Sequence, residues 1–299
     1  MQPLIFASSV LSGEDEQPVC LLAESLRRFG KEYNQAQIWV CVPESGQMLT
    51  AHTRSALRTL DVSLVPYACS EDELAFPFAA KTIAAGAAEK RALGQPDAGL
   101  VWLDSGSLFF NAPVGLQLAP EKQFACRAVD FKLIGSPANE EPDVFWRLIY
   151  EYCGVAAEQI FAVSTWVDRQ QIRAYLNAGM LVTRPQNGLF QRWCTNFRSI
   201  YRQDDFDALY RQNQLYAVFI HQAVLSATLL ASLRPDQFQW LPDNVNYPLH
   251  LHDRVVAERQ PARLNDLVSC RYEQFFEDEH WEEKIRVEEP LRSWLRESV

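Results

Sequence analysis

The first hundred residues alternate short, continuous apolar runs with longer segments whose apolar residues recur at helical spacing. Runs this short, without polar alternation, are typical of strands buried on both faces of a sheet. Because parallel strands need crossover helices, the order predicts a mostly parallel, doubly wound α/β sheet. The predicted strands are residues 3–9, 38–42, 62–66 and 100–103, and the predicted helices between them are residues 18–29, 50–60 and 76–93.

After Pro113 the pattern changes to mixed strands and helices joined by longer irregular connections. No linker rich in Gly, Ser or Pro divides the chain, so we expect a single domain over residues 1–299. Residues 273–299 are heavily charged around a few aromatic side chains, which predicts a peripheral helix with a solvated face. The later strands are predicted at residues 124–129 and 180–183, and the later helices at residues 142–153, 189–201 and 214–233.

The central stretch of the chain is residues 98–113, AGLVWLDSGSLFFNAP. Its first apolar run ends abruptly in Asp104, and Ser105-Gly106-Ser107 then turns the chain. A carboxylate at the carboxyl end of a buried strand lies where open α/β sheets bind ligands, and burying it without a partner costs several kcal/mol. Asp104 therefore needs a metal ion, a hydroxyl or a cationic side chain. The alternative is that Asp104 caps the turn by accepting a hydrogen bond from the amide of Gly106 or Ser107.

Composition and charge argue against some kinds of binding partner. With 299 residues, 48% of them hydrophobic, the chain can bury one large core or two smaller ones. The net charge of -10 is spread along the chain without a basic run, which argues against nucleic acid and against an anionic membrane surface as partners. We find no apolar run approaching the ~20 residues of a membrane span and no basic signal-peptide region, so we expect a cytoplasmic protein without a transmembrane segment.

Seven cysteines are widely scattered and odd in number. No pair has the C-x-x-C spacing of structural zinc sites and redox motifs. Cys20, Cys41 and Cys194 lie inside apolar stretches, so most of these thiols are expected in the core.

Four pieces of the sequence, spread over residues 3 to 252, resemble in their order the nucleotide-sugar glycosyltransferases of the GT-A fold. The resemblance implies a Rossmann-like sheet and an enzyme that transfers a sugar from a nucleotide-diphosphate sugar to an acceptor hydroxyl. The pieces are a first strand ending in Ser8-Ser9, a helix bearing Lys81 before a strand ending in Leu103-Asp104, the segment Asn177-Ala178-Gly179 before another strand, and a later helix bearing Gln222.

The chain departs from this family at the metal motif. In the family, the hydrophobic strand ends in Asp-x-Asp, whose carboxylates hold a divalent metal on the donor's diphosphate. Here the motif is Asp104-Ser105-Gly106, and the second acid is missing. Mn²⁺ and Mg²⁺ prefer hard oxygen ligands, and Gly106 offers only its backbone.

Two ways of neutralising the diphosphate follow from this departure. If Mn²⁺ or Mg²⁺ binds, Asp104 must share it, and the resemblance points to a late His or Asp. The candidate is His250 or His252, which share a face on a predicted strand. The alternative is that both are ordinary surface or packing residues. Alternatively no metal binds, and the diphosphate is neutralised by a cationic side chain, namely Lys81, Arg127 or Lys132.

The resemblance also suggests roles for the remaining pieces. It implies that Ser8 and Ser9 meet the nucleoside, that the turn at residues 105–107 lies by the diphosphate, and that residues 177–179 line the sugar pocket. The Asn177 amide suits a sugar hydroxyl, and Ala178-Gly179 lets a ring approach the backbone. The alternative is that this segment is only a turn before a strand, for which Asn and Gly are equally suited.

His221-Gln222 resembles a family position that usually holds an acidic residue followed by Gln. His221 replaces the acid, and it is the candidate general base toward an acceptor hydroxyl because an imidazole titrates close to neutral pH. Gln222 is carried over with it as a catalytic candidate. The alternative is that His221 is a buried residue whose hydrogen bonds are satisfied inside the core.

The resemblance divides the chain into a nucleotide-binding half at residues 1–113, an acceptor and sugar half at residues 114–252, and a charged extension at residues 253–299. A dinucleotide-binding domain is excluded because the loop at residues 10–17 has one glycine and three acids in place of G-x-G-x-x-G. The predicted function is that of a glycosyltransferase with a sugar-nucleotide donor and an unknown acceptor. The alternative is a catalytically inactive GT-A-like protein, suggested by the missing second acid and by His221.

Overall fold

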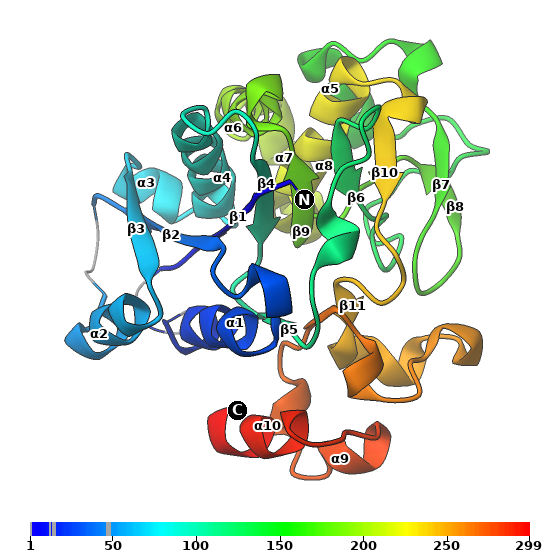
Figure 1. Cartoon of the computed structure of the whole chain (residues 1–299). Coiled ribbons are helices and arrows are strands. Elements are labelled where there is room, and N and C mark those ends of the chain that lie inside the picture. Colours follow the sequence, from blue (N-terminus) through cyan, green and yellow to red (C-terminus); the bar gives the residue numbers. More distant parts are fainter. Residues whose placement is uncertain (1, 12, 14–15, 46–48) are drawn as a thin grey trace.

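A sheet of mostly parallel strands forms the centre of the protein (Figure 1). The computed structural model describes residues 2–11, 13, 16–45 and 49–299. Within them the strand order is β10-β6-β9-β4-β1-β2-β3, and β9 runs antiparallel to both of its neighbours. The mostly parallel α/β sheet predicted from the sequence is therefore confirmed. The strands are β1 (Leu4–Ser9), β2 (Gln37–Pro43), β3 (Val62–Tyr67), β4 (Gly99–Leu103), β6 (Phe124–Cys126), β9 (Met180–Thr183) and β10 (Phe238–Trp240).

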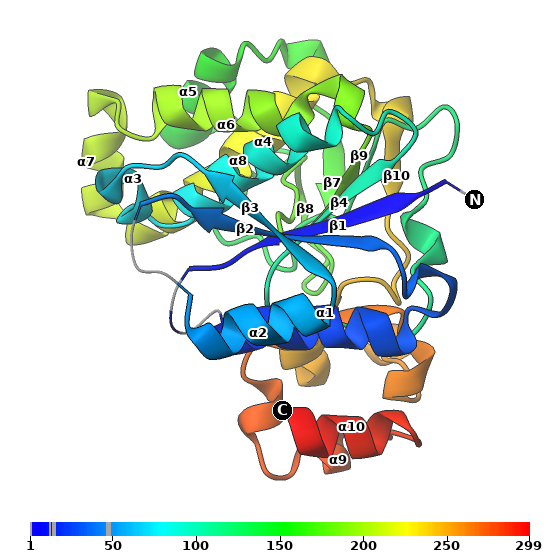
Figure 2. The same cartoon turned by 60° about the vertical axis from the view of Figure 1, so that its left-hand side comes forward.

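Helices cover both faces of this sheet (Figure 2). Alternate residues of β1 enter two different cores: Ile5 and Ala7 pack on one face, and Leu4 and Phe6 on the other. Because both faces are covered, the strands are apolar at successive positions, which explains the continuous runs in the sequence. One face is covered by α1 (Glu16–Phe29) and α2 (Ala51–Thr59), and the other by α4 (Ala79–Ala92), α5 (Val144–Cys153), α6 (Leu189–Ile200) and α8 (Gln214–Ser232), with α7 (Asp204–Gln212) beside α8.

The alanine-rich helix α4 lies between the sheet and α6. Its small side chains, among them Ala84, Ala85 and Ala88, are fully buried. A Cβ added at Gly86 would lie 3.0 Å from the Cβ of Cys194 on α6, so the two helices pack too closely for a larger residue there. This close packing fixes α4, and with it Lys81 in the first turns of the helix.

Helix α8 is a core helix of the domain. Its 19 residues are long and apolar enough to cross a membrane by length and composition, so the expectation that no apolar run approaches this length is wrong. The helix packs against α5, α6 and α7, and its residues 220–230 are buried. Its apolar character is explained by contacts with other helices on several sides.

A second, smaller sheet places residues from the C-terminal part of the chain near the carboxyl end of β4. It has the order β11-β12-β5, in which β12 pairs antiparallel with β5 and places Arg271 opposite Ser107. Beyond it, the Trp294 indole nitrogen donates a hydrogen bond to the Glu24 carboxylate of α1 at 2.6 Å, which holds the peripheral C-terminal helix (Figure 1). These elements are β5 (Ser107–Phe109), β11 (Tyr247–Pro248), β12 (Ser269–Arg271), α9 (Trp281–Lys284) and α10 (Leu291–Ser298).

Two local predictions are wrong. The strand predicted at residues 124–129 ends at Cys126 in β6. His250 and His252 lie in the 3-10 helix Leu249–Arg254 and not on a strand, because β11 ends at Pro248 and the chain then coils. The loop at residues 10–17 includes positions outside the described residues. The remaining short elements are α3 (Glu71–Leu74), β7 (Ala162–Ser164) and β8 (Gln171–Arg173).

All seven cysteines are free thiols. Four of them are buried, and the other three are partly buried. The buried thiols are Cys41, Cys69, Cys126 and Cys270.

Glu89 of α4 generates a pH-dependent prediction. Its carboxylate is fully buried and accepts a hydrogen bond from the backbone amide of Gln191 in α6 at 2.8 Å. Burial raises the pKa of Glu89 to about 7. A carboxyl group whose pKa is raised on folding stabilises the protein most below its unfolded value of 4.5, and this contribution is lost as the pH rises through 7. From pH 5 to pH 8, Glu89→Gln should therefore gain roughly 1 to 3 kcal/mol in the free energy of unfolding relative to wild type.

Urea unfolding at several pH values measures this difference. Glu32→Gln, at an exposed carboxylate, is the matched control and should follow the wild-type pH profile. A constant difference between Glu89→Gln and wild type across this pH range would show that Glu89 does not titrate in this way.

Candidate functional site

Asp104 lies in the turn that follows β4, at the carboxyl end of the strand. Its amide donates to the Gly179 carbonyl at 2.8 Å, and its own carbonyl accepts from the Ser107 amide at 3.1 Å. The main chain therefore closes the turn, and the carboxylate does not act as its cap. The carboxylate instead pairs with the Lys81 ammonium, with Nζ and Oδ1 2.5 Å apart. Of the partners expected for Asp104, the structure supplies the cationic side chain.

Phe78 precedes α4 and positions its first turn beside Asp104. It has a φ of 57°, in the left-handed region that a bulky residue rarely adopts. Its ring stacks on His221 with centroids 4.5 Å apart, and the Lys81 ammonium lies 4.9 Å from its centroid. Phe78 is nevertheless 43% exposed, which is unusual for a large apolar residue at the end of a buried helix.

Two adjoining cavities open beside the Lys81–Asp104 pair. We call them the Asn177 cavity, of about 440 Å³, and the Ser9 cavity, of about 380 Å³. They share one wall, formed by Phe78, Lys81, Asp104, Arg271 and Glu273. The Asn177 cavity is also lined by Val129, Asp130, Phe131, Leu133, Tyr175, Asn177, Phe219, His221, Gln222, His250 and Leu251, and the Ser9 cavity by Ser9, Leu11, Leu74, Phe76, Ala80, Ser105 and Gly106.

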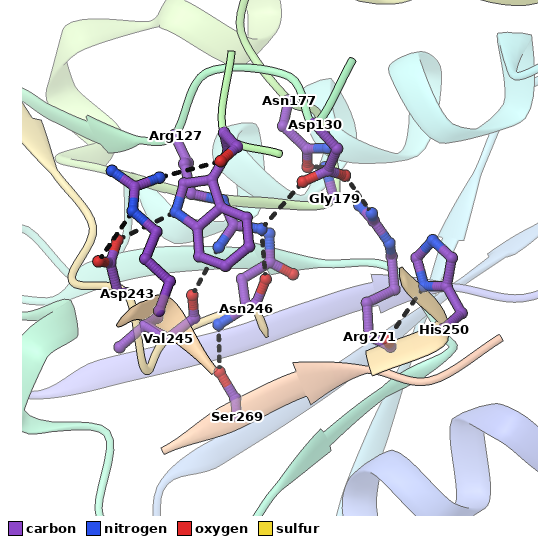
Figure 3. Close-up of polar contacts among 12 residues, drawn as sticks. Arg127, Asp130, Asn177, Gly179, Asp243, Val245, Asn246, His250, Ser269 and Arg271 are labelled. Carbon is purple, nitrogen blue, oxygen red and sulfur yellow. Dashed lines mark hydrogen bonds and ion pairs between the residues drawn. The ribbon is translucent and has the colours of Figure 1, made fainter. Parts of the chain in front are cut away.

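Arg271 is a site residue that the sequence analysis missed. Its guanidinium contacts the Asp130 carboxylate at 2.5 Å (Figure 3). It also lies 3.2 Å from the Glu273 carboxylate. Burial alone lowers the pKa of Arg271, but Asp130 and Glu273 raise it, so the group stays charged. A Cβ on Gly179 would lie 2.8 Å from Asn177 Oδ1, 3.1 Å from Asp104 Oδ2 and 3.2 Å from Arg271 Nη1, so a larger residue there would crowd all three groups.

The other two cations proposed for the diphosphate do not line either cavity. Arg127 is buried, and its guanidinium donates to the Asn246 carbonyl at 2.6 Å (Figure 3). The guanidinium also lies 4.4 Å from the Trp166 ring centroid. Lys132 lies outside both linings. Of the three predicted candidates, Lys81 is therefore the one that the described structure places at the site.

The segment at residues 177–179 forms a turn, and of its three residues Asn177 lines the Asn177 cavity, while Ala178 and Gly179 line neither cavity. The Asn177 side-chain oxygen accepts from the Gly179 amide at 2.8 Å, which forms the turn. The Ala178 amide donates to the Gln222 side-chain oxygen at 2.9 Å, and the Gln222 nitrogen donates to the Tyr175 hydroxyl at 3.0 Å. Gln222 thus ties α8 to Ala178 of this segment and to Tyr175 just before it.

His221 lies on α8 at the wall of the Asn177 cavity. Its Nδ1 is 2.9 Å from the Val218 carbonyl, which can only accept, so Nδ1 carries the proton. Burial, and then the charge of Lys81, hold the pKa of His221 well below 6.5. The neutral ring therefore keeps an unprotonated Nε2.

The predicted serine and glycine positions divide into two groups. Ser9, Ser105 and Gly106 line the Ser9 cavity. Ser8 and Ser107 are buried outside both linings, and their hydroxyls lack a hydrogen-bond partner within the described structure. Ser9, Ser105 and Gly106 therefore lie where a ligand in the Ser9 cavity can reach them.

The predicted metal candidates Asp104 and His250 line the same cavity, but the donor set around them does not fit a divalent cation. His250 Nε2 lies 3.3 Å from the Glu273 carboxylate. The carboxylates of Asp104, Asp130 and Glu273 are each paired with Lys or Arg. Among the described residues there is no group of three or more His, Cys, Asp or Glu that could hold a metal ion.

Three of the seven described non-glycine residues with positive φ lie at these cavities. Three non-glycine residues of the Asn177 cavity have positive φ, namely Phe78 at 57°, Leu133 at 39° and Glu273 at 43°. Such conformations cost on the order of 1–3 kcal/mol each and cluster at functional sites. Sequence patterns gave no sign of them, because none of the three is Gly or Asn.

Solved structures of three glycosyltransferases are similar to this chain. Galactosyltransferase LgtC, solved in complex with donor and acceptor sugar analogues, is 14% identical with a TM-score of 0.45, over 90% of this chain and 87% of that one. The glycosyltransferase GlyE of Streptococcus pneumoniae is 13% identical with a TM-score of 0.50, over 100% of this chain and 64% of that one. The bifunctional glycosyltransferase WbbM is 10% identical with a TM-score of 0.46, over 99% of this chain and 52% of that one.

Sequence comparison identifies the family. No curated protein matches the chain in sequence. The model of the Rhodobacterales glycosyltransferase domain matches residues 10–231, which is well over half of the chain. The GT-A resemblance in the sequence is confirmed by this match and by the fold. The chain belongs to the Rhodobacterales glycosyltransferase family.

Proposed function

We propose that this glycosyltransferase takes its sugar from a nucleotide-diphosphate sugar and passes it to an acceptor hydroxyl in the two adjoining cavities. The observation that carries the proposal is the wall they share, at the carboxyl ends of β1 and β4. Open α/β sheets bind ligands at this edge. The donor consists of a nucleoside and a sugar linked by a diphosphate. One cavity can hold the nucleoside and the other the sugar, with the diphosphate at the wall that they share.

The Ser9 cavity suits the nucleoside. Leu11, Leu74 and Phe76 offer an apolar surface to a flat base, and Ser9 and Ser105 offer polar groups to the nucleoside. The nucleoside in this cavity places the diphosphate toward Lys81 at the shared wall.

The Asn177 cavity suits the sugar and the acceptor. Polar groups from Asn177, Asp130 and His250 line it together with the apolar side chains of Leu133 and Phe219. Sugar rings carry hydroxyls at their edges and apolar C–H faces, so a mixed lining of this kind fits them.

His221 serves as the proton acceptor in this proposal. The acceptor hydroxyl oxygen bonds to the anomeric carbon, its proton passes to His221 Nε2, and the nucleoside diphosphate leaves with the electron pair of the broken bond. The Nδ1 hydrogen bond to the Val218 carbonyl fixes the tautomer that leaves Nε2 free. Gln222 acts as a positioning residue, because its amide is already used by Ala178 and Tyr175.

The direct test of the proposal is turnover. The full chain, incubated with UDP-sugars and GDP-sugars in turn, with and without Mn²⁺, should release the nucleoside diphosphate from at least one of them. Calorimetric titration should show binding of the corresponding nucleoside diphosphate. Binding without turnover would support the inactive GT-A-like alternative, and the absence of both would overturn the proposed donor class.

His221→Ala should lower kcat by about 10²- to 10⁴-fold, the usual contribution of a general base, while nucleoside diphosphate binding stays unchanged. In the wild type, His221 can accept a proton from the acceptor hydroxyl only while its imidazole is neutral. Since the pKa of His221 is held well below 6.5 by burial and by Lys81, activity should persist as the pH falls through 6.5 and decline only below it. The pH profile of kcat measures this.

His52→Ala, at an exposed histidine of α2, is the control and should retain wild-type kcat. Wild-type turnover in His221→Ala would exclude His221 as the base.

Gln222→Ala should destabilise the chain by about 1–3 kcal/mol, because it leaves the Ala178 amide and the Tyr175 hydroxyl without their partner in a buried place. It should also raise KM for the donor, since residues 177–179 lose their tether to α8. Chemical denaturation and donor kinetics measure the two effects. Gln214→Ala, at an exposed position of the same helix, should change neither quantity. Equal stability of the two variants would contradict the tether.

A further inference from the structure

We infer that Lys81 and Arg271 bind the donor's diphosphate directly, in place of the divalent cation that an Asp-x-Asp motif holds. This inference rests on the proposed function, because it specifies how the same site recognises its donor. It assigns a binding role to Arg271, which comes from the far end of the chain.

The first support is position. Lys81 and Arg271 line both the Asn177 cavity and the Ser9 cavity, and in the described part of the chain no other lysine or arginine lines either one. The group that joins a nucleoside in one cavity to a sugar in the other must pass their shared wall. The diphosphate therefore meets these two side chains.

The second support is free hydrogen-bonding capacity. The Lys81 ammonium has three donors, and its ion-pair partner is Asp104 Oδ1 at 2.5 Å. The Arg271 guanidinium donates a hydrogen bond from Nη2 to Asp130, while Nε lies 3.2 Å from the Glu273 carboxylate without a hydrogen bond and Nη1 lies beside Gly179. The carboxylates hold both cations in place, and the remaining N–H groups are available for phosphate oxygens.

The third support is the chemistry of the acidic groups. The Asp104 carboxylate is paired with Lys81, and Asp130 is buried between Arg127 and Arg271. Gly106, where the second acid of the motif belongs, has no side chain. A Cβ added there would meet no atom within 4 Å, so packing does not prevent an acid at this position. There is room for a second carboxylate at position 106, but this chain has glycine there.

This arrangement also suits the reaction. As the bond from the anomeric carbon breaks, its electron pair stays on the diphosphate oxygen, where negative charge increases. Fixed cations aimed at that oxygen stabilise the transition state more than the ground state. Asp104 has a positioning role here, because it orients the Lys81 ammonium without touching the diphosphate.

Calorimetric titration of the full chain with UDP and GDP, in EDTA and in Mn²⁺, tests the inference. The wild type should bind its nucleotide with dissociation constants that agree within about threefold in the two conditions. Lys81→Gln and Arg271→Gln should each weaken binding roughly 10- to 100-fold in EDTA, because each removes charged hydrogen bonds. Lys90→Gln, at an exposed lysine of the same helix α4, is the matched control and should bind as the wild type does.

Two further variants serve as controls. One distinguishes lost binding from misfolding, and the other tests whether a restored acid makes binding depend on metal. Arg271→Lys keeps the charge beside Asp130 and should bind more tightly than Arg271→Gln, with thermal unfolding recorded for both. Gly106→Asp fills the open position and should make binding tighter in Mn²⁺ than in EDTA. If Gly106→Asp stayed insensitive to Mn²⁺, the missing acid would not be what determines the mode of binding.

The outcomes distinguish the inference from the proposed function. Wild-type binding that requires Mn²⁺ would overturn the inference and leave the proposed function intact. Wild-type affinity retained in Lys81→Gln and Arg271→Gln would also overturn it. The absence of binding to any nucleoside diphosphate in either condition would overturn the proposed function and the inference with it.

Discussion

The ion pair between Lys81 and Asp104 is the interaction on which the site depends. It joins the first turns of α4 to the carboxyl end of β4, across the 2.5 Å between Nζ and Oδ1. The hydrogen bond from the Asp104 amide to the Gly179 carbonyl adds the start of β9 to the same point. An acid that would be costly to bury alone is thereby held at the edge of the sheet, together with a cation that faces both cavities.

The rest of the fold brings distant segments to this pair. Close packing of α4 against α6 fixes Lys81, and pairing of β12 with β5 places Arg271 beside the turn after Asp104. Gly179 leaves room for both charged groups. The Gln222 amide then ties α8, and so His221, to the segment before β9. The C-terminal segment therefore contributes to the site through β12, while its last helix packs on α1.

The sequence predicted the features that depend on local pattern. Continuous apolar runs predicted the parallel strands, because both faces of each strand are covered, and an abrupt acid after such a run predicted the position of Asp104. Arg271 could not be predicted, because it reaches the site through a strand pairing that links residues 107 and 271, and no local signal marks it. The alternation around His250 and His252 predicted a strand, but β11 ends at Pro248 and a 3-10 helix follows. The strained backbone of Phe78 had no signal either, because a bulky residue occupies a conformation that usually selects glycine.

A crystal structure of the full chain with its bound sugar nucleotide tests the central claim most directly, through the distances from the diphosphate oxygens to Lys81 Nζ and Arg271 Nη1. The account predicts that both distances lie within hydrogen-bond range, with the nucleoside in the Ser9 cavity and the sugar in the Asn177 cavity. A diphosphate bound away from the wall that these two residues share would contradict it.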